Sequence, residues 1–380
     1  MRRTLYTEEH EVFRTAFRSF VDRQAVPYVD HWENAGTPDR AFIEKAAKAG
    51  FLGFEFPAAY GGLDVADFRY NTVVAEEVVA SGMAGDTFSM QNDIALPYLL
   101  TLTTDEQKQR WLPRFTQGQL VTAIAMTEPG AGSDLRSIRT TARPTGDELV
   151  INGSKTFITS GSTCDLVLAL VTSEVGGGEL SVVAVENGTP GFERGRPMKK
   201  IGRKGQDTAE LFFSECRVPI TNVVGQLGRG LAHIVANLPR ERLSIAVQAV
   251  ASAQRALTMA AEYAQQREVF GAPLGSMQSV RMAIGEIHTE VTALQEYLDR
   301  CVLALNAGDF SPAEGAGAKF LATELQWKVL DRTMQMFGGY GYMEESEIAR
   351  MWRDARVQRI YGGANELLLD SIGKAVLGGR

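Results

Sequence analysis

The sequence predicts an α+β protein of three domains: an N-terminal helical domain, a middle β-barrel or β-sandwich, and a C-terminal four-helix bundle. Residues 1–120 show the apolar spacing of amphipathic helices, and residues 229–380 return to long helical segments. Between them, residues 121–228 hold short Val-, Ile-, Thr- and Phe-rich segments separated by turn residues. A length of 380 residues also exceeds what one core usually holds, which favours several packed domains.

The N-terminal domain opens with a predicted amphipathic helix. In TEEHEVFRTAFRSFVDR, apolar residues recur with the i, i+3, i+4, i+7 spacing of a buried helix face, and Thr7 followed by acids is typical of an N-cap. A second helix is expected between Pro38 and Gly50, because proline favours helix starts and glycine helix ends. A third is expected after Thr103 or Thr104, either of which can act as its cap.

The middle and C-terminal domains follow from the same kind of pattern. VTAIAM, CDLVLALVT, LSVVAVE and AELFFSECRV are typical of strands, and TGDELVI predicts a hairpin turn. Beyond residue 229, three long Ala- and Leu-rich segments are joined by short connections, which is typical of a bundle. The second ends near Asn306 and Gly308, and the third begins with Ser311 as cap and Pro312 in the first helical position.

Composition excludes several classes of protein. A net charge of −7 argues against a nucleic-acid binder. The four histidines do not show metal-binding spacing, so no metal site is expected. Without a signal peptide, transit peptide or long apolar run, the protein is expected to be cytoplasmic and not membrane-bound. Three scattered cysteines are expected to be buried and reduced: Cys164, Cys216 and Cys301.

A glycine-rich loop, AMTEPGAGSDL (125–135), directly follows an apolar strand segment. Glycines let backbone N–H groups approach a ligand closely, although a tight surface turn would use the same residues. No G-x-G-x-x-G lies between a strand and a helix, so a bound dinucleotide would not use a Rossmann unit.

This loop and five further motifs resemble the acyl-CoA dehydrogenase family. The motifs are INGSKTFITSG, GRKGQDTAELFFSECRVP, QREVFGAPLGSMQSVR, MQMFGGYGY and RIYGGANE, and they occur in the family's order over essentially the whole chain. The resemblance implies the same three-domain fold, tightly bound FAD, an acyl-CoA substrate and a role such as fatty-acid β-oxidation. It also implies an electron-transfer flavoprotein as electron acceptor and a homotetramer, or a dimer with the same interface.

The resemblance assigns one set of residues to the flavin ring. The loop from Ile124 to Ser133 would run along the isoalloxazine, with Thr127 bonded to it and Ser133 near both flavin and substrate. Phe157, Ile158 and Thr159 would cover the flavin, with Thr159 at its N5 edge. Phe157 stands where many members have tryptophan, and an ordinary strand residue is the alternative interpretation of it. The residues expected at the ring are Ile124, Ala125, Met126, Thr127, Gly132, Ser133, Phe157, Ile158 and Thr159.

A second set is assigned to the rest of the cofactor. Arg267, Phe270 and Gln278 would contact the diphosphate and adenosine, and the planar arginine fork suits a diphosphate. The run Gln335, Met336, Phe337, Gly338 and Gly339 would contact the adenosine end from a neighbouring subunit, although its glycines could simply end a helix. Ala364 replaces a usual threonine and loses one FAD contact, whereas Asn365 and Glu366 match the family.

The catalytic base is expected at Glu241. The resemblance implies removal of the substrate's α-proton by a carboxylate and transfer of a β-hydride to flavin N5, giving a trans-2-enoyl-CoA. Most members place a glutamate where this chain has Gly362, whereas long-chain and isovaleryl members place it in an ERL context, as in RERLSIA here. Pro239 favours the first turn of a helix, so the alternative is that Glu241 only stabilises a helix N-terminus.

Three more residues are expected near the substrate. Arg242 would contact substrate or CoA, with a solvated or structural arginine as the alternative, and Tyr361 would lie beside it. The N–H of Gly362, with a ribityl hydroxyl of FAD, would bind the thioester carbonyl. Two other functions remain open on this fold: an oxygen-using flavin oxidase or monooxygenase, and a non-catalytic regulatory or DNA-binding flavoprotein, against which the acidic charge speaks.

Overall fold

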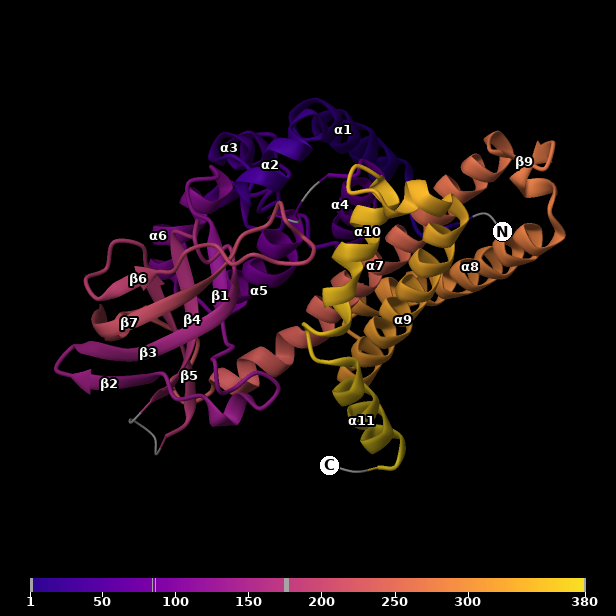
Figure 1. The fold of residues 1–380 in the computed structure, drawn as a ribbon. Coiled ribbons are helices and arrows are strands. Elements are labelled where there is room, and N and C mark those ends of the chain that lie inside the picture. The colour runs from indigo at the N-terminus through magenta and orange to yellow at the C-terminus, as the bar shows by residue number, and fades with distance from the viewer. Residues whose placement is uncertain (1–2, 84, 86, 174–177, 379–380) are drawn as a thin grey trace.

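The computed structural model describes residues 3–83, 85, 87–173 and 178–378 of the chain. A β-sheet lies on one side of the molecule and the long C-terminal helices lie on the other (Figure 1). The N-terminal helices lie along the top of both in this view. The chain thus has the helical, β and helical domains that its pattern predicts.

The N-terminal helices begin where their caps predict. Thr7 and His10 form a reciprocal capping box at the start of α1, and the Thr104 hydroxyl accepts the N–H of Gln107 at the start of α6. A π-helical segment, Ser89–Ala95, precedes α5, and such segments are frequent at functional sites. The α-helices are α1 (Glu8–Gln24), α2 (Val29–Ala35), α3 (Arg40–Lys48), α4 (Phe68–Ala80), α5 (Leu96–Thr101) and α6 (Asp105–Thr116).

The middle domain is one mixed sheet of eight strands in the described part of the chain. The order is β6-β7-β3-β2-β4-β5-β8, and β1 pairs in parallel with β4. The hairpin predicted at TGDELVI joins β2 to β3, with Gly146 in the left-handed region at φ +63°. The strands are β1 (Thr122–Ala125), β2 (Thr141–Thr145), β3 (Glu148–Thr159), β4 (Leu166–Ser173), β5 (Leu180–Glu186), β6 (Phe192–Arg194), β7 (Thr208–Pro219) and β8 (Val223–Val224).

The C-terminal bundle is built on three long helices. Ser311 caps α9 and Pro312 is its first residue, as predicted. A short hairpin of β9 (Glu268–Val269) and β10 (Ala272–Pro273) separates α7 from α8. The helices are α7 (Gly230–Gln266), α8 (Gln278–Asn306), α9 (Pro312–Phe337), α10 (Glu347–Ala355) and α11 (Asn365–Val376).

The expected position of Pro239 in a first helical turn is wrong. Helix α7 begins at Gly230 and runs through Pro239, so Glu241 lies in the helix interior. At this proline α7 packs closely on α9, since a Cβ on Gly315 would lie 2.9 Å from the Pro239 Cα. The interpretation of Glu241 as a residue that stabilises a helix N-terminus therefore does not hold.

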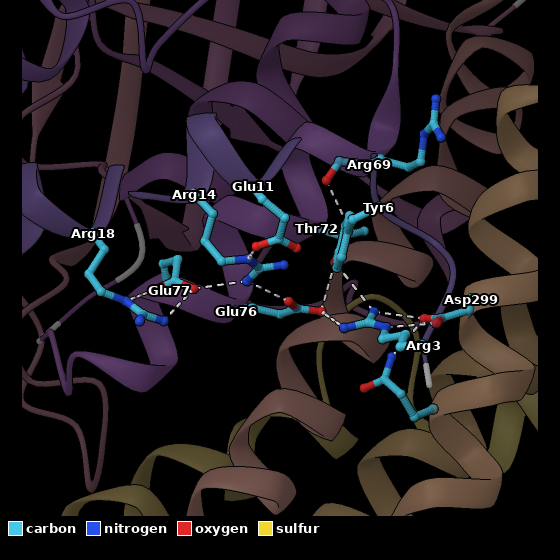
Figure 2. A network of polar contacts seen from close by, with 11 residues as sticks. Arg3, Tyr6, Glu11, Arg14, Arg18, Arg69, Thr72, Glu76, Glu77 and Asp299 are labelled. Carbon is cyan, nitrogen blue, oxygen red and sulfur yellow. Dashed lines mark hydrogen bonds and ion pairs between the residues drawn. The ribbon is translucent and has the colours of Figure 1, made fainter. Parts of the chain in front are cut away.

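An ion-pair network joins the start of the chain to two domains (Figure 2). The Arg3 guanidinium donates to Glu76 of α4 and, with two bonds of 2.7 Å, to Asp299 of α8. Arg14 of α1 donates to both Glu76 and Glu77. This network holds α1, α4 and α8 together and so fixes the N-terminal helices against the bundle.

Neither a membrane-spanning helix nor a metal-binding cluster occurs among the described residues. No helix among them is long and apolar enough to cross a membrane. None of their His, Cys, Asp and Glu side chains gather in a group that could hold a metal ion. The cysteines are free and buried: Cys164, Cys216 and Cys301.

Candidate functional site

The Glu241 carboxyl is the most unusual ionisable group on α7. Its residue is only 7% exposed, and burial raises the pKa of the carboxyl to about 7. A hydrogen bond from Tyr98 and the nearby Arg242 charge oppose this rise but do not cancel it. A carboxyl that changes charge near neutral pH is suited to proton transfer.

Tyr98 orients this carboxyl from across the α5–α7 contact. Its hydroxyl donates to Glu241 Oε1 at 3.1 Å, and both side chains are buried. Burial, followed by the Glu241 charge, raises the pKa of Tyr98 well above its usual value, so the phenol stays protonated as a donor. In the described part of the chain no donor binds Oε2, so that oxygen is available to accept a proton. Sequence reasoning missed Tyr98, because nothing local to ALPYLL signals a contact with α7.

The double glycine before α11 adopts a backbone that only glycine accommodates readily. Gly362 and Gly363 have φ of +64° and +96°. A Cβ on Gly362 would lie 2.6 Å from Cδ1 of Ile245, one turn beyond Glu241 on α7. This contact brings Gly362 beside the helix face that carries Glu241. Within the described residues, the N–H groups of Gly362 and Gly363 have no acceptor.

Two cations hold the carbonyls of this turn. Arg242 donates from Nε to the Gly362 carbonyl at 3.1 Å, so it contacts the turn directly. Lys319 of α9, completely buried, donates from Nζ to the Gly363 carbonyl and to Asn365 Oδ1, each at 2.8 Å. Because each carbonyl shares its planar peptide with the N–H of the next residue, fixing the Gly362 carbonyl also fixes the direction of the Gly363 N–H, and fixing the Gly363 carbonyl fixes that of the Ala364 N–H. Lys319 was not expected, although a lone lysine among alanines in GAGAKFLA is a usable signal.

The glycine-rich loop is fixed to β3 by a buried ion pair. Lys155 of β3 is fully buried and donates to Glu128 at 2.8 Å and to the Met126 carbonyl at 3.1 Å. Burial alone would raise the pKa of Glu128, but bonds from Lys155, Thr140 and the Arg139 backbone hold it below its usual value. The Thr156 N–H also donates to the Thr127 carbonyl. These contacts bring the two predicted flavin-ring segments together, and sequence reasoning missed the ion pair.

Phe157 is placed as a ligand-covering residue would be. It is 65% exposed and has φ of +59°, in a register irregularity between β3 and β7. A bulky residue at positive φ is strained, and such strain is concentrated at functional sites. An ordinary strand residue would have neither property. Among its expected neighbours, Ile158 is buried and Thr159 half-buried on β3, Ile124 and Ala125 lie on β1, and Gly132 and Ser133 are exposed.

Five of the residues expected at the far end of the cofactor line one open pocket. Arg267, at the end of α7, lines an open pocket of about 570 Å³ together with Met336, Phe337, Gly338 and Gly339. Among the described residues no carboxylate pairs with the Arg267 guanidinium, which is therefore available to an anion. Gly338 also ends α9, as the alternative interpretation expected.

Phe270 lies in the turn between β9 and β10, beside that pocket's end of α7. It is 99% exposed with φ of +51°. A phenylalanine so placed contributes nothing to the core of its own chain, which favours contact with a ligand or another subunit.

The remaining predicted residues are dispersed. Gln278 is the first residue of α8 and Gln335 lies near the end of α9, and both are exposed. Ala364 precedes α11 and Glu366 is exposed on it. Asn365 is buried and bonded to Thr323 and Glu324 of α9, so its side chain supports the turn. Tyr361 lies beneath the Arg203 guanidinium, 5.8 Å from its ring centre.

Comparison with protein families covers nearly the whole chain. Residues 7–119, 123–216 and 228–377 match the models of the acyl-CoA dehydrogenase N-terminal, middle and C-terminal domains. The chain is 38% identical over 379 residues to the long-chain specific acyl-CoA dehydrogenase of Rattus norvegicus, covering 99% of this chain and 88% of that protein.

Solved structures of similar fold match nearly the whole chain as well. An acyl-CoA dehydrogenase from Geobacillus kaustophilus superposes with a TM-score of 0.95 at 41% identity, covering 98% of each chain. A chain in a structure titled as the electron transferring flavoprotein of Acidaminococcus fermentans superposes with a TM-score of 0.92 at 31% identity, covering 99% of this chain and 100% of that one.

Proposed function

Because this chain belongs to the acyl-CoA dehydrogenase family and is an FAD-dependent oxidoreductase, we propose that it converts an acyl-CoA thioester to the trans-2-enoyl-CoA with Glu241 as the base. One observation supports this most strongly: a buried carboxyl with a pKa of about 7 that a buried tyrosine orients.

The base works from the interior of α7. Tyr98 holds Oε1 of Glu241, so Oε2 takes the α-proton of the substrate. A base of this pKa is largely ionised slightly above neutral pH and still strong enough to remove a proton from an activated carbon. Expulsion of water by the acyl group would raise its pKa further.

The α-proton is acidic enough only if the thioester oxygen is stabilised. The N–H groups of Gly362 and Gly363 are the donors that this chain offers beside Glu241, and Arg242 and Lys319 hold the carbonyls of the same turn. Backbone donors fixed before the reaction stabilise developing negative charge without reorganising. We therefore assign Arg242 and Lys319 to positioning of the turn.

The residues present fit FAD. Phe157 is an exposed, strained aromatic beside the loop that Lys155 fixes, and Arg267 is an unpaired cation in an open pocket. Phe157 would cover the ring system, and Arg267 would bind the diphosphate. When bound, FAD supplies an acceptor for the hydride that leaves the β-carbon.

We also propose that electrons pass to an electron-transfer flavoprotein and that the chain forms a homotetramer or a dimer. The first follows from the family and from the structural match in Acidaminococcus fermentans. The second is supported by apolar side chains on and beside α11 that the single chain leaves exposed, among them Ile360, Leu367 and Val376.

The test is anaerobic reduction of the bound flavin, followed by its absorbance. A panel of acyl-CoA esters of several lengths, including branched esters, is added to the wild-type holoenzyme and to Glu241→Gln. We expect bleaching with at least one ester in the wild type and none in the variant, with the FAD content unchanged. Bleaching of the variant at the wild-type rate would contradict the assignment of Glu241. No bleaching of either protein would favour the oxygen-using or non-catalytic functions.

A further inference from the structure

A partly open cavity lined by both polar and apolar side chains lies between α4, α7, α9 and α10. Its volume is about 90 Å³, which is space for several water-sized groups. Gln248 and Ser252 of α7 line it, as do Gln326 of α9 and Gln358, which follows α10. Each of these four side chains is less than 9% exposed. Apolar side chains of α4 and α10 line much of the rest, yet four buried hydrogen-bonding side chains in one place are unusual in a helix bundle, whose interior is normally apolar.

Two of these side chains are incompletely bonded. The amide oxygens of Gln326 and Gln358 are buried, and neither has a hydrogen-bond partner among the described residues. Leaving a buried acceptor without a partner is destabilising, so such groups usually have a partner that binds in the space beside them. Two glutamine amides can both donate and accept, and therefore suit a ligand group that does the same.

The cavity lies on the same helix face as the base. Residues 241, 245, 248 and 252 are three or four apart on α7, so they form one stripe, and residue 248 is ~10 Å along the axis from residue 241. Ile245, in that stripe, adjoins Gly362. From the other side, Arg203 lines the cavity, donates to Gln248 and lies over Tyr361. The cavity is therefore bounded by direct neighbours of the proposed thioester site.

Between base and cavity the same helix face presents apolar Ile245 and, next to it, polar Ser244. Ser244 donates to Asp93 of the π-helical segment and contacts Ser89 at 3.1 Å, and Gln248 donates to Ser244 at 3.5 Å. An aliphatic acyl chain beside Ser244 and Gln248 would gain less free energy of burial than it would beside leucine or valine, because polar side chains offer less apolar contact. Hydrogen-bonding side chains therefore run along this face from Ser244 to Gln248, which lines the cavity.

The charges around the cavity balance. Its lining has two arginines, Arg203 and Arg350, and two carboxylates, Glu347 and Asp354. Glu347 is already paired with Arg255, and the Arg203 backbone N–H donates to Asp354. A ligand with a negative charge would need cations in the lining that are not already balanced by carboxylates. The ligand group that fits is therefore polar and uncharged.

We propose that this cavity receives the far end of the acyl chain, and that the substrate therefore carries an uncharged group there that can donate a hydrogen bond, such as a hydroxyl. This inference rests on the proposed dehydrogenation at Glu241. Gln248, Gln326 and Gln358 determine the specificity, because a buried polar site that a ligand leaves unbonded discriminates against that ligand.

The test compares esters of matched length on the holoenzyme. Decanoyl-CoA, 10-hydroxydecanoyl-CoA and the mono-CoA ester of decanedioic acid are assayed, with the hexanoyl and 6-hydroxyhexanoyl pair as shorter probes. We expect kcat/KM for the hydroxy ester to exceed that of the plain ester by about tenfold or more at the length that reaches the cavity, as one good hydrogen bond provides. Dissociation constants of the same esters are measured by calorimetry on Glu241→Gln, which binds without turning over.

Variants locate the effect. Gln248→Leu should reverse the preference in favour of decanoyl-CoA, and the milder Ser252→Ala should reduce it while keeping the fold. Gln254→Leu, the same substitution on an exposed position of α7, should leave it unchanged. The dissociation constants should show the same ratios as kcat/KM.

The outcomes separate this inference from the proposed function. If plain esters are dehydrogenated and the hydroxy esters have no advantage, the cavity holds only water and the inference is wrong, although the function stands. Preference for the dicarboxylic ester would overturn the uncharged assignment. If no ester reduces the flavin but the hydroxy esters still bind more tightly, the function fails and the specificity of the cavity stands.

Discussion

Replacement of Glu241 by glutamine should affect stability and catalysis in opposite directions. The carboxyl has a pKa of about 7 in the folded chain against 4.5 in the unfolded chain. An acid with the higher pKa in the folded state holds more protons when folded, so its charge destabilises the fold as the pH rises from about 4.5 to about 7. At ~1.36 kcal/mol for each pKa unit, the full effect above neutral pH is about 3 kcal/mol.

The assay is denaturant unfolding of the holoenzyme at pH 5 and pH 8, with the wild type and the variant side by side. Glu241→Gln should be more stable than the wild type by a few kcal/mol at pH 8, and by much less at pH 5, because near pH 5 the wild-type carboxyl is protonated when folded. In the same samples kcat/KM should fall by about 10²–10⁴-fold, the usual contribution of a general base. Wild-type kcat/KM should rise with pH through the pKa of the free enzyme.

A control distinguishes burial from charge. Glu296 is an exposed glutamate on α8, and Glu296→Gln should change stability by less than ~0.5 kcal/mol at either pH. If the stability gain of Glu241→Gln were the same at pH 5 and pH 8, the carboxyl would not be a buried group with a raised pKa, and the argument for it as the base would fail.

Three further predictions test the surroundings. Tyr98→Phe removes a bond that lowers the pKa of Glu241, so the pH profile of kcat/KM should move to higher pH; an unchanged profile would exclude Tyr98 from the site. Gly362→Ala should cost about 1–3 kcal/mol in thermal or urea unfolding, because φ is +64° and the new Cβ meets Ile245, and Ile245→Val should recover part of the loss. Lys155→Met should lower the free energy of unfolding by about 3–5 kcal/mol, because it leaves the buried Glu128 carboxylate unpaired, and it should release FAD. Replacing the Glu128 carboxylate by an amide in the same protein should restore both stability and FAD binding. Full stability of the single variant would contradict the buried pair.

Local sequence rules predicted the elements of the fold well. Thr7, Thr104 and Ser311 are the N-caps of their helices, in agreement with the sequence pattern, because a cap depends only on residues within one turn. The start of α7 was misplaced for the opposite reason. A proline that suits a first turn can also lie inside a longer helix, and the local pattern did not show that this helix begins nine residues earlier, at Gly230.

The candidate site shows the same limit. Glu241 and Gly362 could be paired from the sequence because RERLSIA and RIYGGANE together resemble the pattern of the long-chain and isovaleryl members of the family. Their supporting residues could not, because Tyr98 and Lys319 are distant in sequence and reach the site only through packing of α5 and α9. The cavity around Gln248 was also invisible, because glutamine on a helix is usually exposed and only the fold shows it buried.

At Phe157 the stability of the fold and the binding of the cofactor favour different residues. An exposed aromatic at positive φ destabilises the isolated chain, and glycine or asparagine would relieve strain on the order of 1 kcal/mol. Replacing Phe157 by glycine or asparagine would also remove the aromatic ring proposed to cover the flavin. Selection of this protein for heat resistance alone should therefore favour loss of the aromatic at this position, and selection for cofactor retention should oppose it. Libraries screened for thermal tolerance would be expected to collect flavin-poor variants there.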